Sequence, residues 1–196
     1  MKTIIFASGN EGKVQEVKDI FKDTHYKIIS LAELDDVPEI IEDGKTFEEN
    51  ARIKAETIFK KFGMPVMSDD SGLEVDQLFG APGVFSARYA GEECSYEDNN
   101  RKLIAALLEK APPHKARFVC CAYYIDDELS FHVTGEMKGE ITKEPRGTNG
   151  FGYDPIFKPE GYEETLAELK LDEKNSISHR ARAFSKLKLQ MLEEVH

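Results

Sequence analysis

Short apolar runs rich in β-branched residues alternate with amphipathic helical segments along this chain of 196 residues. Residues 2–7 form the first such run, residues 8–13 are polar and contain glycine, and apolar side chains recur at helical spacing over 14–21. A run, a tight polar turn and a helix in this order are typical of a strand–turn–helix unit. Repetition of that unit predicts an α/β fold with a mixed sheet.

The same criteria predict the remaining elements. The strand over 64–68 should stop at Asp69, because acids, serine and glycine do not extend an apolar core strand. Thr46 and Glu49, and again Ser95 and Asp98, have the spacing of a capping box at a helix start. The predicted elements are a strand over 26–31, a helix over 46–62, a strand over 64–68, a helix from 95, an antiparallel hairpin of 116–125 with 128–134, and a helix over 178–194.

Length and charge limit the classes of function. One compact domain over residues 1–196 is the default for this length, and two lobes around a cleft are also within the usual range. The formal net charge is −11, from 37 acidic and 26 basic residues. Such a chain repels a polyanion, so we expect no nucleic-acid partner. An acidic protein still binds a small phosphorylated ligand where a few cations, backbone donors and a metal ion gather.

Hydropathy and cysteine spacing point to a cytosolic protein. No apolar stretch approaches the length of a membrane span, and residues 1–7 are too short for a secretory signal, so we expect no membrane association and a cytoplasmic location. Cys120 and Cys121 are adjacent and Cys94 stands alone. This is neither a metal-binding spacing nor an even-numbered disulfide framework.

The polar segment after the first predicted strand has the composition of a phosphate-binding turn. Its glycines let backbone N–H groups approach a ligand, the next helix offers the positive end of its dipole, and its lysine adds a full charge. Its spacing matches neither the common P-loop nor the dinucleotide fingerprint. A turn that uses Gly and Asn only to reverse the chain is the alternative. The segment reads Ser8-Gly9-Asn10-Glu11-Gly12-Lys13.

A second polar segment, Glu42-Asp43-Gly44, leads into the predicted helix that carries Asn50 and Lys54. Residues four apart share one face of a helix, so the amide and the ammonium could reach into one site. Taken alone, this segment is better explained as a solvated helix face with an Asn–Lys contact.

A third segment, Asp69-Asp70-Ser71-Gly72, follows a predicted buried strand. Two adjacent carboxylates repel each other unless a cation or hydrogen bonds compensate them. Hard oxygen ligands of this kind suit Mg²⁺, which usually keeps several waters and bridges one or two carboxylates to substrate phosphates. A helix cap or an Asx turn would use one of the acids and leave the other unexplained.

The fourth segment spans residues 148–155 and is followed by basic residues at the start of the last predicted helix. Glycines around two aromatic rings expose ring faces on which a base can stack, and Asp154 can accept hydrogen bonds. His179 and Arg180 lie where the helix dipole disfavours cations unless an anion is present. The alternatives are an N-cap at Ser178 with basic neighbours by chance, and a loop that packs its aromatic rings on the core.

Together the segments resemble one known family. Six motifs occur in the family's order between residue 4 and about residue 187, namely SGNEGK, TFEENARIKA, SDDSGLEVD, GAPGVFSARYAG, GTNGFGYDPIF and EKNSISHRARAF. They are similar to those of the inosine/xanthosine triphosphate pyrophosphatases, the Ham1-like enzymes that remove deaminated purine nucleotides. The resemblance implies an elongated, mixed central β-sheet flanked by helices, with two lobes around a nucleotide cleft.

The resemblance also implies a reaction, the hydrolysis of ITP, dITP or XTP between the α- and β-phosphates with Mg²⁺ as cofactor. Asp70 matches the family's catalytic acid, which binds the metal and accepts a proton from the attacking water. Glu42 matches the other metal carboxylate, although Glu39 or Asp43 could take that role. Lys54 matches a catalytic, phosphate-facing lysine.

Further positions match substrate contacts of the family. Residues 8–13 match the triphosphate loop, Ser71 a substrate contact, and a third set the nucleobase pocket. Donors to the purine 6-oxo group would select hypoxanthine or xanthine over adenine, because adenine's amino group leaves them unpaired. The family is usually homodimeric, and apolar residues around 79–90 could form the interface. The nucleobase set is Phe151, Gly152, Tyr153, Asp154, Lys174, His179 and Arg180.

Two other functions stay open at this level. A related pyrophosphatase for modified pyrimidine nucleotides would share the general fold but not the FGYDP and SHR segments. A nucleotide-binding protein without catalytic activity would bind the same ligands and turn none over.

Overall fold

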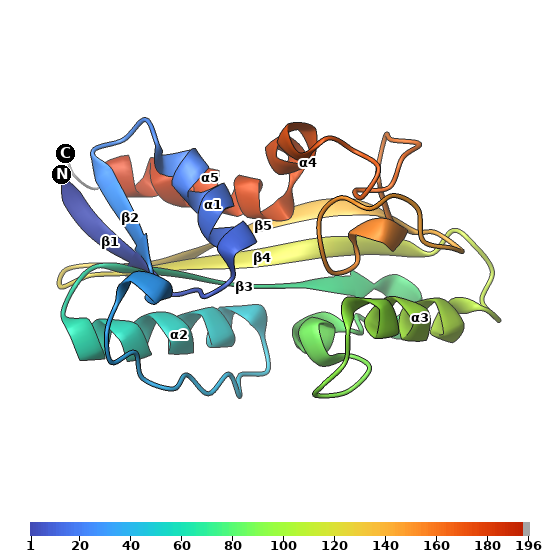
Figure 1. Cartoon of the computed structure of the whole chain (residues 1–196), viewed down its shortest axis with the longest axis horizontal. Coiled ribbons are helices and arrows are strands. Elements are labelled where there is room, and N and C mark those ends of the chain that lie inside the picture. The colour runs from blue at the N-terminus through green and yellow to red at the C-terminus, as the bar shows by residue number, and fades with distance from the viewer. Residues whose placement is uncertain (194–196) are drawn as a thin grey trace. The chain divides into compact units, whose positions relative to one another are not determined.

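The computed structural model describes residues 1–193. Within them the strands form one six-stranded sheet in the order β2-β1-β3-β4-β5-β6 (Figure 1). β1 runs parallel to β2 and to β3, whereas β5 and β6 are antiparallel, so the sheet is mixed as predicted. The strands are β1 (Lys2–Phe6), β2 (Tyr26–Ser30), β3 (Val66–Val75), β4 (Lys115–Ile125), β5 (Ser130–Ile141) and β6 (Phe157–Pro159).

Two helices, α2 and α3, begin at the capping residues that the sequence indicates, and a third, α1, begins at a cap that was not predicted. The side chain of Asn10 accepts a hydrogen bond from the amide of Lys13 at the start of α1, and Thr46 accepts one from Glu49 at the start of α2. Ser95 forms a complete capping box at the start of α3. The helices are α1 (Glu11–Phe21), α2 (Phe47–Phe62), α3 (Tyr96–Leu107), α4 (Leu171–Ile177) and α5 (His179–Glu193).

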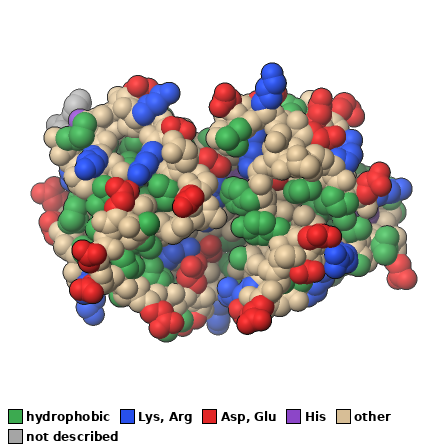
Figure 2. All heavy atoms as spheres, in the orientation of Figure 1, with side chains coloured by type: hydrophobic (Ala, Val, Ile, Leu, Met, Phe, Trp, Pro, Cys, Tyr) green, Lys and Arg blue, Asp and Glu red, His purple; other side chains and the backbone are tan. Residues whose placement is uncertain are grey.

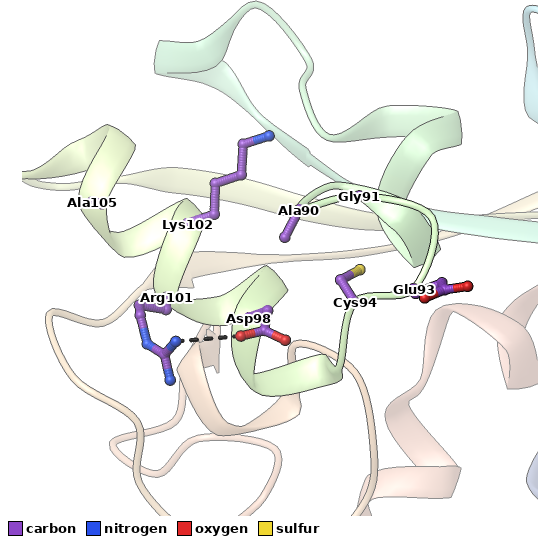
Figure 3. Close-up of a pocket in the computed structure, with 8 residues that line it drawn as sticks. All are labelled: Ala90, Gly91, Glu93, Cys94, Asp98, Arg101, Lys102 and Ala105. Atoms are coloured by element: carbon purple, nitrogen blue, oxygen red, sulfur yellow. Dashed lines mark hydrogen bonds and ion pairs between the residues drawn. The ribbon is translucent and has the colours of Figure 1, made fainter.

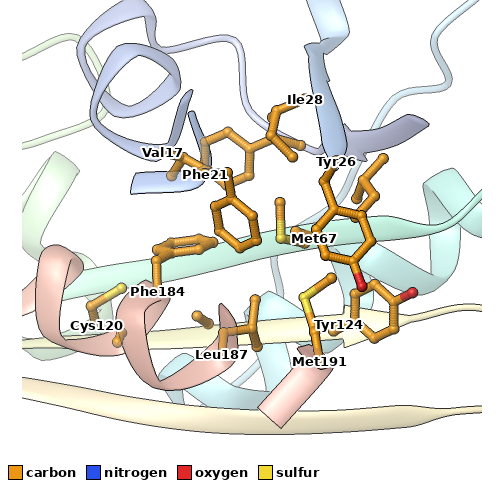
Figure 4. Packing of buried hydrophobic residues seen from close by; sticks show 14 residues of the cluster. Val17, Phe21, Tyr26, Ile28, Met67, Cys120, Tyr124, Phe184, Leu187 and Met191 are labelled. Atoms are coloured by element: carbon orange, nitrogen blue, oxygen red, sulfur yellow. The ribbon is translucent and has the colours of Figure 1, made fainter. Parts of the chain in front are cut away.

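The chain forms two compact units, which are described separately. Unit 1 contains residues 1–70, 120–135 and the chain from 180 on, and unit 2 contains residues 71–119 and 136–179. In unit 1, side chains of β1, α1 and α5 pack together around Phe6, Phe21 and Phe184, each at most 1% exposed (Figure 4). The core of unit 2 includes Leu73, Leu103 and Phe157, all fully buried.

Strand register places two polar segments of unit 1 side by side. Phe6 at the end of β1 pairs with Met67 in β3. Because β1 and β3 are parallel, the turn that follows β1 lies beside the residues of β3 just beyond Met67. These residues are Ser68 and the acid pair, Asp69 and Asp70, so the turn over residues 8–13 lies next to the two carboxylates.

Three predictions about elements need correction. β3 does not stop at Asp69 but runs on to Val75, because the Asp69 carboxylate is paired with cations inside the unit. The second strand of the hairpin runs to Ile141, well past residue 134. The short elements α4 and β6 were not predicted, because seven and three residues carry too little periodicity. The predicted end of the last helix, residue 194, lies outside the described residues.

Among the helices within residues 1–193, none has the length and apolar composition to span a bilayer. On the face drawn in Figure 2, lysine and arginine side chains lie scattered among acidic ones.

Candidate active site

The two carboxylates of the acid pair point to opposite faces of β3. Successive residues of a strand alternate between faces, so Asp69 and Asp70 meet different elements. In Figure 1, α1 and α5 lie on one face of the unit 1 sheet and α2 lies on the other. Asp69 contacts residues of α1 and α5, and Asp70 contacts residues of α2. Adjacent acids are tolerated here because each face provides its own partners.

Asp69 is enclosed by cations. It is 2% exposed, and its carboxylate lies 3.0 Å from Lys13 Nζ and 3.4 Å from Arg180 Nε. The Cys120 thiol is a further neighbour at 3.8 Å. Removal of either cation would leave charge uncompensated in a buried site, which is strongly destabilising. We therefore assign Asp69 to holding α1 and α5 against β3.

Arg180 belongs to the same buried cluster. It is 3% exposed and donates to Glu16 Oε2 at 2.8 Å as well as to Asp69. Burial lowers the pKa of its guanidinium, but the charges of Asp69 and Glu16 outweigh burial and keep the pKa above its ordinary value. The sequence required an anion for a cation at this helix start, and two carboxylates of unit 1 meet that requirement.

Asp70 lies in a different environment. Asn50 Nδ2 donates to its Oδ2 at 3.1 Å, and Lys54 Nζ lies 3.7 Å from its Oδ1. Burial raises the pKa of Asp70 above its ordinary value, because it outweighs the charge of Lys54 and the hydrogen bond from Asn50. A carboxylate with a raised pKa is a suitable proton acceptor.

Lys54 links Asp70 to the segment before α2. Its Nζ lies 2.6 Å from Glu42 Oε2, and the whole residue is 8% exposed. Burial lowers the Lys54 pKa, but the charges of Asp70, Asp69 and Glu42 outweigh this and raise it overall. Asn50 is 3% exposed, so the solvated helix face favoured for this segment taken alone is wrong. α2 instead turns these residues inward.

Gly44 is needed where the acidic segment meets α2. Its amide donates to Asn50 Oδ1 at 2.8 Å, and a Cβ at this position would lie 2.6 Å from the same oxygen. The close approach fixes the Asn50 carboxamide so that its Nδ2 points to Asp70. The sequence offered this signal in the glycine of Glu42-Asp43-Gly44, because only glycine leaves room for the contact.

The donor set fits a hard divalent cation. Glu42 and Asp70 both approach Lys54 Nζ, so their carboxylates converge on one small region of unit 1. Glu39, Glu42 and Asp43 are all exposed, and among them Glu42 is the acid that pairs with Lys54. In residues 1–193, no three His, Cys, Asp or Glu side chains are grouped as a metal site. Two carboxylates, with waters and phosphate oxygens completing the shell, are the usual protein share of a Mg²⁺ site.

The turn over residues 8–13 presents a helix N-terminus beside the acid pair. Asn10 caps α1, its own amide donates to Ser8 Oγ at 3.2 Å, and the first turn of α1 starts at Glu11. Amides of a first helical turn lack intrahelical acceptors and are suited to phosphate oxygens. The sequence predicts that Lys13 contacts phosphate. In the structure Lys13 forms an ion pair with Asp69, so it stabilises the arrangement of the site and also adds positive charge to it.

Unit 2 holds the aromatic loop over residues 147–154, here called the 147–154 loop. The Asp154 carboxylate accepts a hydrogen bond from the Phe151 amide at 2.9 Å and forms an ion pair with Lys174 at 2.7 Å. Lys174 Nζ also lies 4.7 Å from the centroid of the Phe151 ring. Asp154 and Lys174 are each 5% exposed. The structure thus brings three predicted nucleobase residues together.

The other predicted nucleobase residues have different surroundings. Tyr153 is 4% exposed and its hydroxyl donates to the Ser86 carbonyl at 2.8 Å, while the Gly152 carbonyl accepts from Asn100. The His179 ring stacks on Phe118 with centroids 4.8 Å apart. Tyr153 therefore anchors the loop through its hydroxyl.

One residue of the buried cluster, Glu16, was missed in the sequence, and another, Asp69, was assigned differently from the structure. Glu16 was not singled out, although it is three residues from Lys13 on the same face of α1 and so was within reach of the same site. Asp69 was treated as half of a metal pair, whereas it is paired with cations. Ser71 lies half-buried on β3 in unit 2.

A separate surface pocket of about 570 Å³ lies in unit 2 beside α3 (Figure 3). Three of its charged side chains already have partners: Arg101 pairs with Asp98 at 3.3 Å, and Lys102 donates to the Tyr89 carbonyl. It is lined by Ala90, Gly91, Glu93, Cys94, Asp98, Arg101, Lys102 and Ala105, a set that includes none of the site residues predicted from the sequence.

Sequence comparison gives close relatives over nearly the whole chain. A model of the Ham1 family matches residues 4–190. A protein of Bacillus licheniformis named dITP/XTP pyrophosphatase is 52% identical over 95% of this chain and 96% of its own length. A Bacillus subtilis protein of the same name is 49% identical, with the same shares covered.

Solved structures agree with the sequence comparison. A HAM1 protein from Coxiella burnetii superposes with a TM-score of 0.92 at 41% identity, covering 98% of this chain and 100% of that one. The Ham1 protein of Staphylococcus aureus gives a TM-score of 0.90 at 42% identity with the same coverage.

Proposed function

Because the chain belongs to the Ham1 family, we propose that it hydrolyses dITP, ITP and XTP to the nucleoside monophosphate and pyrophosphate with Mg²⁺. The names of relatives about half identical over nearly the full chain support the reaction and its substrates. The observation that carries the mechanism is the convergence of Asp70 and Glu42 on Lys54. Removal of deaminated purines from the nucleotide pool is the role that this reaction serves.

Proton transfer is the task proposed for Asp70. Its carboxylate accepts a proton from the water whose oxygen attacks phosphorus, and the bond broken is the anhydride between the α- and β-phosphates. Mg²⁺ held by Glu42 and Asp70 would supply positive charge against that developing on the phosphate oxygens. Lys54 adds a second, fixed positive charge and stays protonated, as its raised pKa favours.

Binding of the polyphosphate is proposed for the 8–13 turn. The amides at the start of α1 donate to phosphate oxygens, and Lys13 contributes positive charge while it remains paired with Asp69. Ser71 follows Asp70 directly and is proposed as a further substrate contact.

The purine is assigned to unit 2. The Phe151 ring offers a stacking face, and Asp154 with Lys174 offers an acceptor and a donor. A donor to the 6-oxo group of hypoxanthine or xanthine would be left unpaired by adenine. Guanine also has a 6-oxo group, so its rejection depends on its 2-amino group. His179 and Arg180 complete the proposed set. Arg180 belongs to unit 1, where it is paired with Glu16 and Asp69.

We further propose that residues 1–196 act as one enzyme domain in the cytoplasm, as a homodimer. The segment around 79–90 supports self-association, because Phe79 is fully exposed and Phe85 is 57% exposed. Exposed aromatic side chains of this kind are typical of interfaces. Sedimentation of the wild type and of a Phe79→Ser variant would test the assembly, and a monomeric wild type would contradict it.

A substrate panel tests the reaction. Purified protein with Mg²⁺ is incubated with ITP, dITP, XTP, ATP, GTP, dUTP and dTTP, and pyrophosphate and orthophosphate are measured separately. We expect pyrophosphate from the first three only. Preference for dUTP or dTTP would support the pyrimidine alternative, and binding without any product would support a non-catalytic nucleotide-binding protein.

A further inference from the structure

A turn at residues 165–169 holds both ends of the 147–154 loop. The Ala167 carbonyl accepts hydrogen bonds from the amides of Thr148 (3.1 Å) and Asn149 (3.0 Å), and the Ala167 amide donates to the Asp154 carbonyl at 3.2 Å. The Asn149 side chain donates to the Leu169 carbonyl at 3.0 Å. Thr148 and Asn149 near the start of the loop and Asp154 at its end are therefore bonded to one turn, and Phe151 lies between them.

Thr165 opens this turn and connects it to the chain just before the loop. The residue is fully buried, and its hydroxyl donates to the Arg146 carbonyl at 2.8 Å. Its own amide donates to the Glu168 carboxylate at 2.8 Å, which is half of a capping box. In a complete box the hydroxyl would accept from the Glu168 amide, but that amide donates to the Thr165 carbonyl at 3.0 Å. The Thr165 hydroxyl thus ties the loop to the turn.

Backbone packing makes this connection stiff. Gly147 has a φ of 80°, and a Cβ on it would lie 2.3 Å from the carbonyl carbon of Ala167. Loop and turn therefore meet backbone to backbone, with no flexible side chain between them to absorb a shift. A displacement of the turn at Thr165 is passed directly to Thr148 and to Asp154.

We propose that Thr165 is a positioning residue for nucleobase binding, because its hydroxyl fixes the loop that carries Phe151 and Asp154. This inference rests on the proposed function, in which that loop contacts the purine. Valine at position 165 keeps the shape but leaves the Arg146 carbonyl without its donor. The chain just before the loop then loses its hydrogen bond to the turn, so the turn and the loop bonded to it are held less firmly. Asp70, Lys54 and the 8–13 turn of unit 1 keep their contacts.

The experiment compares Thr165→Val with Thr165→Ser and with the control Thr142→Val. Thr142 also lies in unit 2, and its hydroxyl donates to backbone carbonyls outside the loop, those of Glu144 at 2.8 Å and Ile156 at 3.3 Å. We expect Thr165→Val to raise KM for ITP by about tenfold, the effect of one lost buried hydrogen bond, with kcat within about twofold of wild type. Its KM for ribose 5-triphosphate, which has no base, should not change. Thr165→Ser and Thr142→Val should behave as wild type with both substrates.

Amide hydrogen exchange provides a readout that does not depend on turnover. Thr165→Val should speed exchange at the amides of Thr148 and Asn149, which Thr142→Val should leave unchanged. Unchanged exchange, or equal losses on ITP and ribose 5-triphosphate, would overturn the positioning role. A wild type inactive on the whole panel would overturn the proposed function and the nucleobase part of this inference, while the exchange data would still decide whether Thr165 fixes the loop.

Discussion

Unit 1 and unit 2 build the binding regions proposed for each of them from different kinds of interaction. Unit 1 gathers charged side chains from β3 and three helices, and each carboxylate of its acid pair has a basic partner. Unit 2 uses a loop whose shape depends on backbone hydrogen bonds to the 165–169 turn and on one buried ion pair, Lys174 with Asp154. A rigid framework of charges suits phosphate chemistry, and a shaped loop suits recognition of a planar base.

This difference predicts that substitutions in the two units will have different effects. Changes to the charges of unit 1 should affect turnover or folding, because a buried charge that loses its partner is costly. Changes to the loop of unit 2 should affect KM for base-bearing substrates, because the loop has no part in proton transfer. A loop variant that lowers only kcat, or a unit 1 charge variant that changes only KM for base-bearing substrates, would contradict this prediction.

Asp70→Asn should have the largest effect. We expect kcat to fall by about 10³-fold, because the amide cannot accept the proton from water. The melting temperature should stay near that of wild type, since burial already disfavours the Asp70 charge. Steady-state pyrophosphate release and a thermal melt measure both quantities. Turnover close to wild type would remove Asp70 from its proposed role.

Arg180→Met should act on folding. It leaves Asp69 and Glu16 buried with less compensation, and we expect the free energy of unfolding to fall by about 3–5 kcal/mol. Urea denaturation measures the loss, with Arg182→Met at an exposed position of the same helix as control. Equal stability of the two variants would contradict the buried cluster.

Phe151→Ala should raise KM for ITP by about tenfold with little change in kcat, because one stacking face is lost. Tyr96 is the matched control, since its ring lies 6.4 Å from that of Phe151 and is half exposed. Initial rates over a range of ITP concentrations separate the two parameters. A loss confined to kcat would indicate that Phe151 takes part in the chemical step, and it would contradict the prediction that loop variants act on KM.

Asp126→Asn should have the smallest effect, on stability alone. Burial raises the pKa of Asp126, but hydrogen bonds from Tyr124, Lys2 and two backbone amides outweigh it and hold the pKa at about 2. A folded pKa below the unfolded value stabilises the protein above pH 4 and loses this effect as the pH falls toward 2. We expect the substitution to lower the free energy of unfolding by about 1–2 kcal/mol at pH 7, allowing for partial solvent screening.

Urea denaturation of wild type and Asp126→Asn at pH 7 and at pH 3 measures this contribution. The difference between the two proteins should shrink at the lower pH, and ITP hydrolysis at pH 7 should be the same for both. A difference that grows on acidification would show that the sign is wrong.

Local pattern was enough for most elements. Helix caps at Thr46 and Ser95 were predicted because capping depends on residues three apart in the chain. The end of β3 was predicted wrongly because Asp69 and Asp70 look like a strand terminator until their partners are known. Those partners come from residues 13, 50, 54 and 180, which local pattern does not connect to β3.

By itself the sequence determined the family, the mixed α/β class and the segments that carry charge, glycine and aromatic rings, because these are properties of residue order and spacing. Which cations and amides each acid of the pair contacts follows from the tertiary structure alone. Strand alternation sends Asp69 toward Lys13 and Arg180 and sends Asp70 toward Asn50 and Lys54, and that depends on which helix covers each face of the sheet.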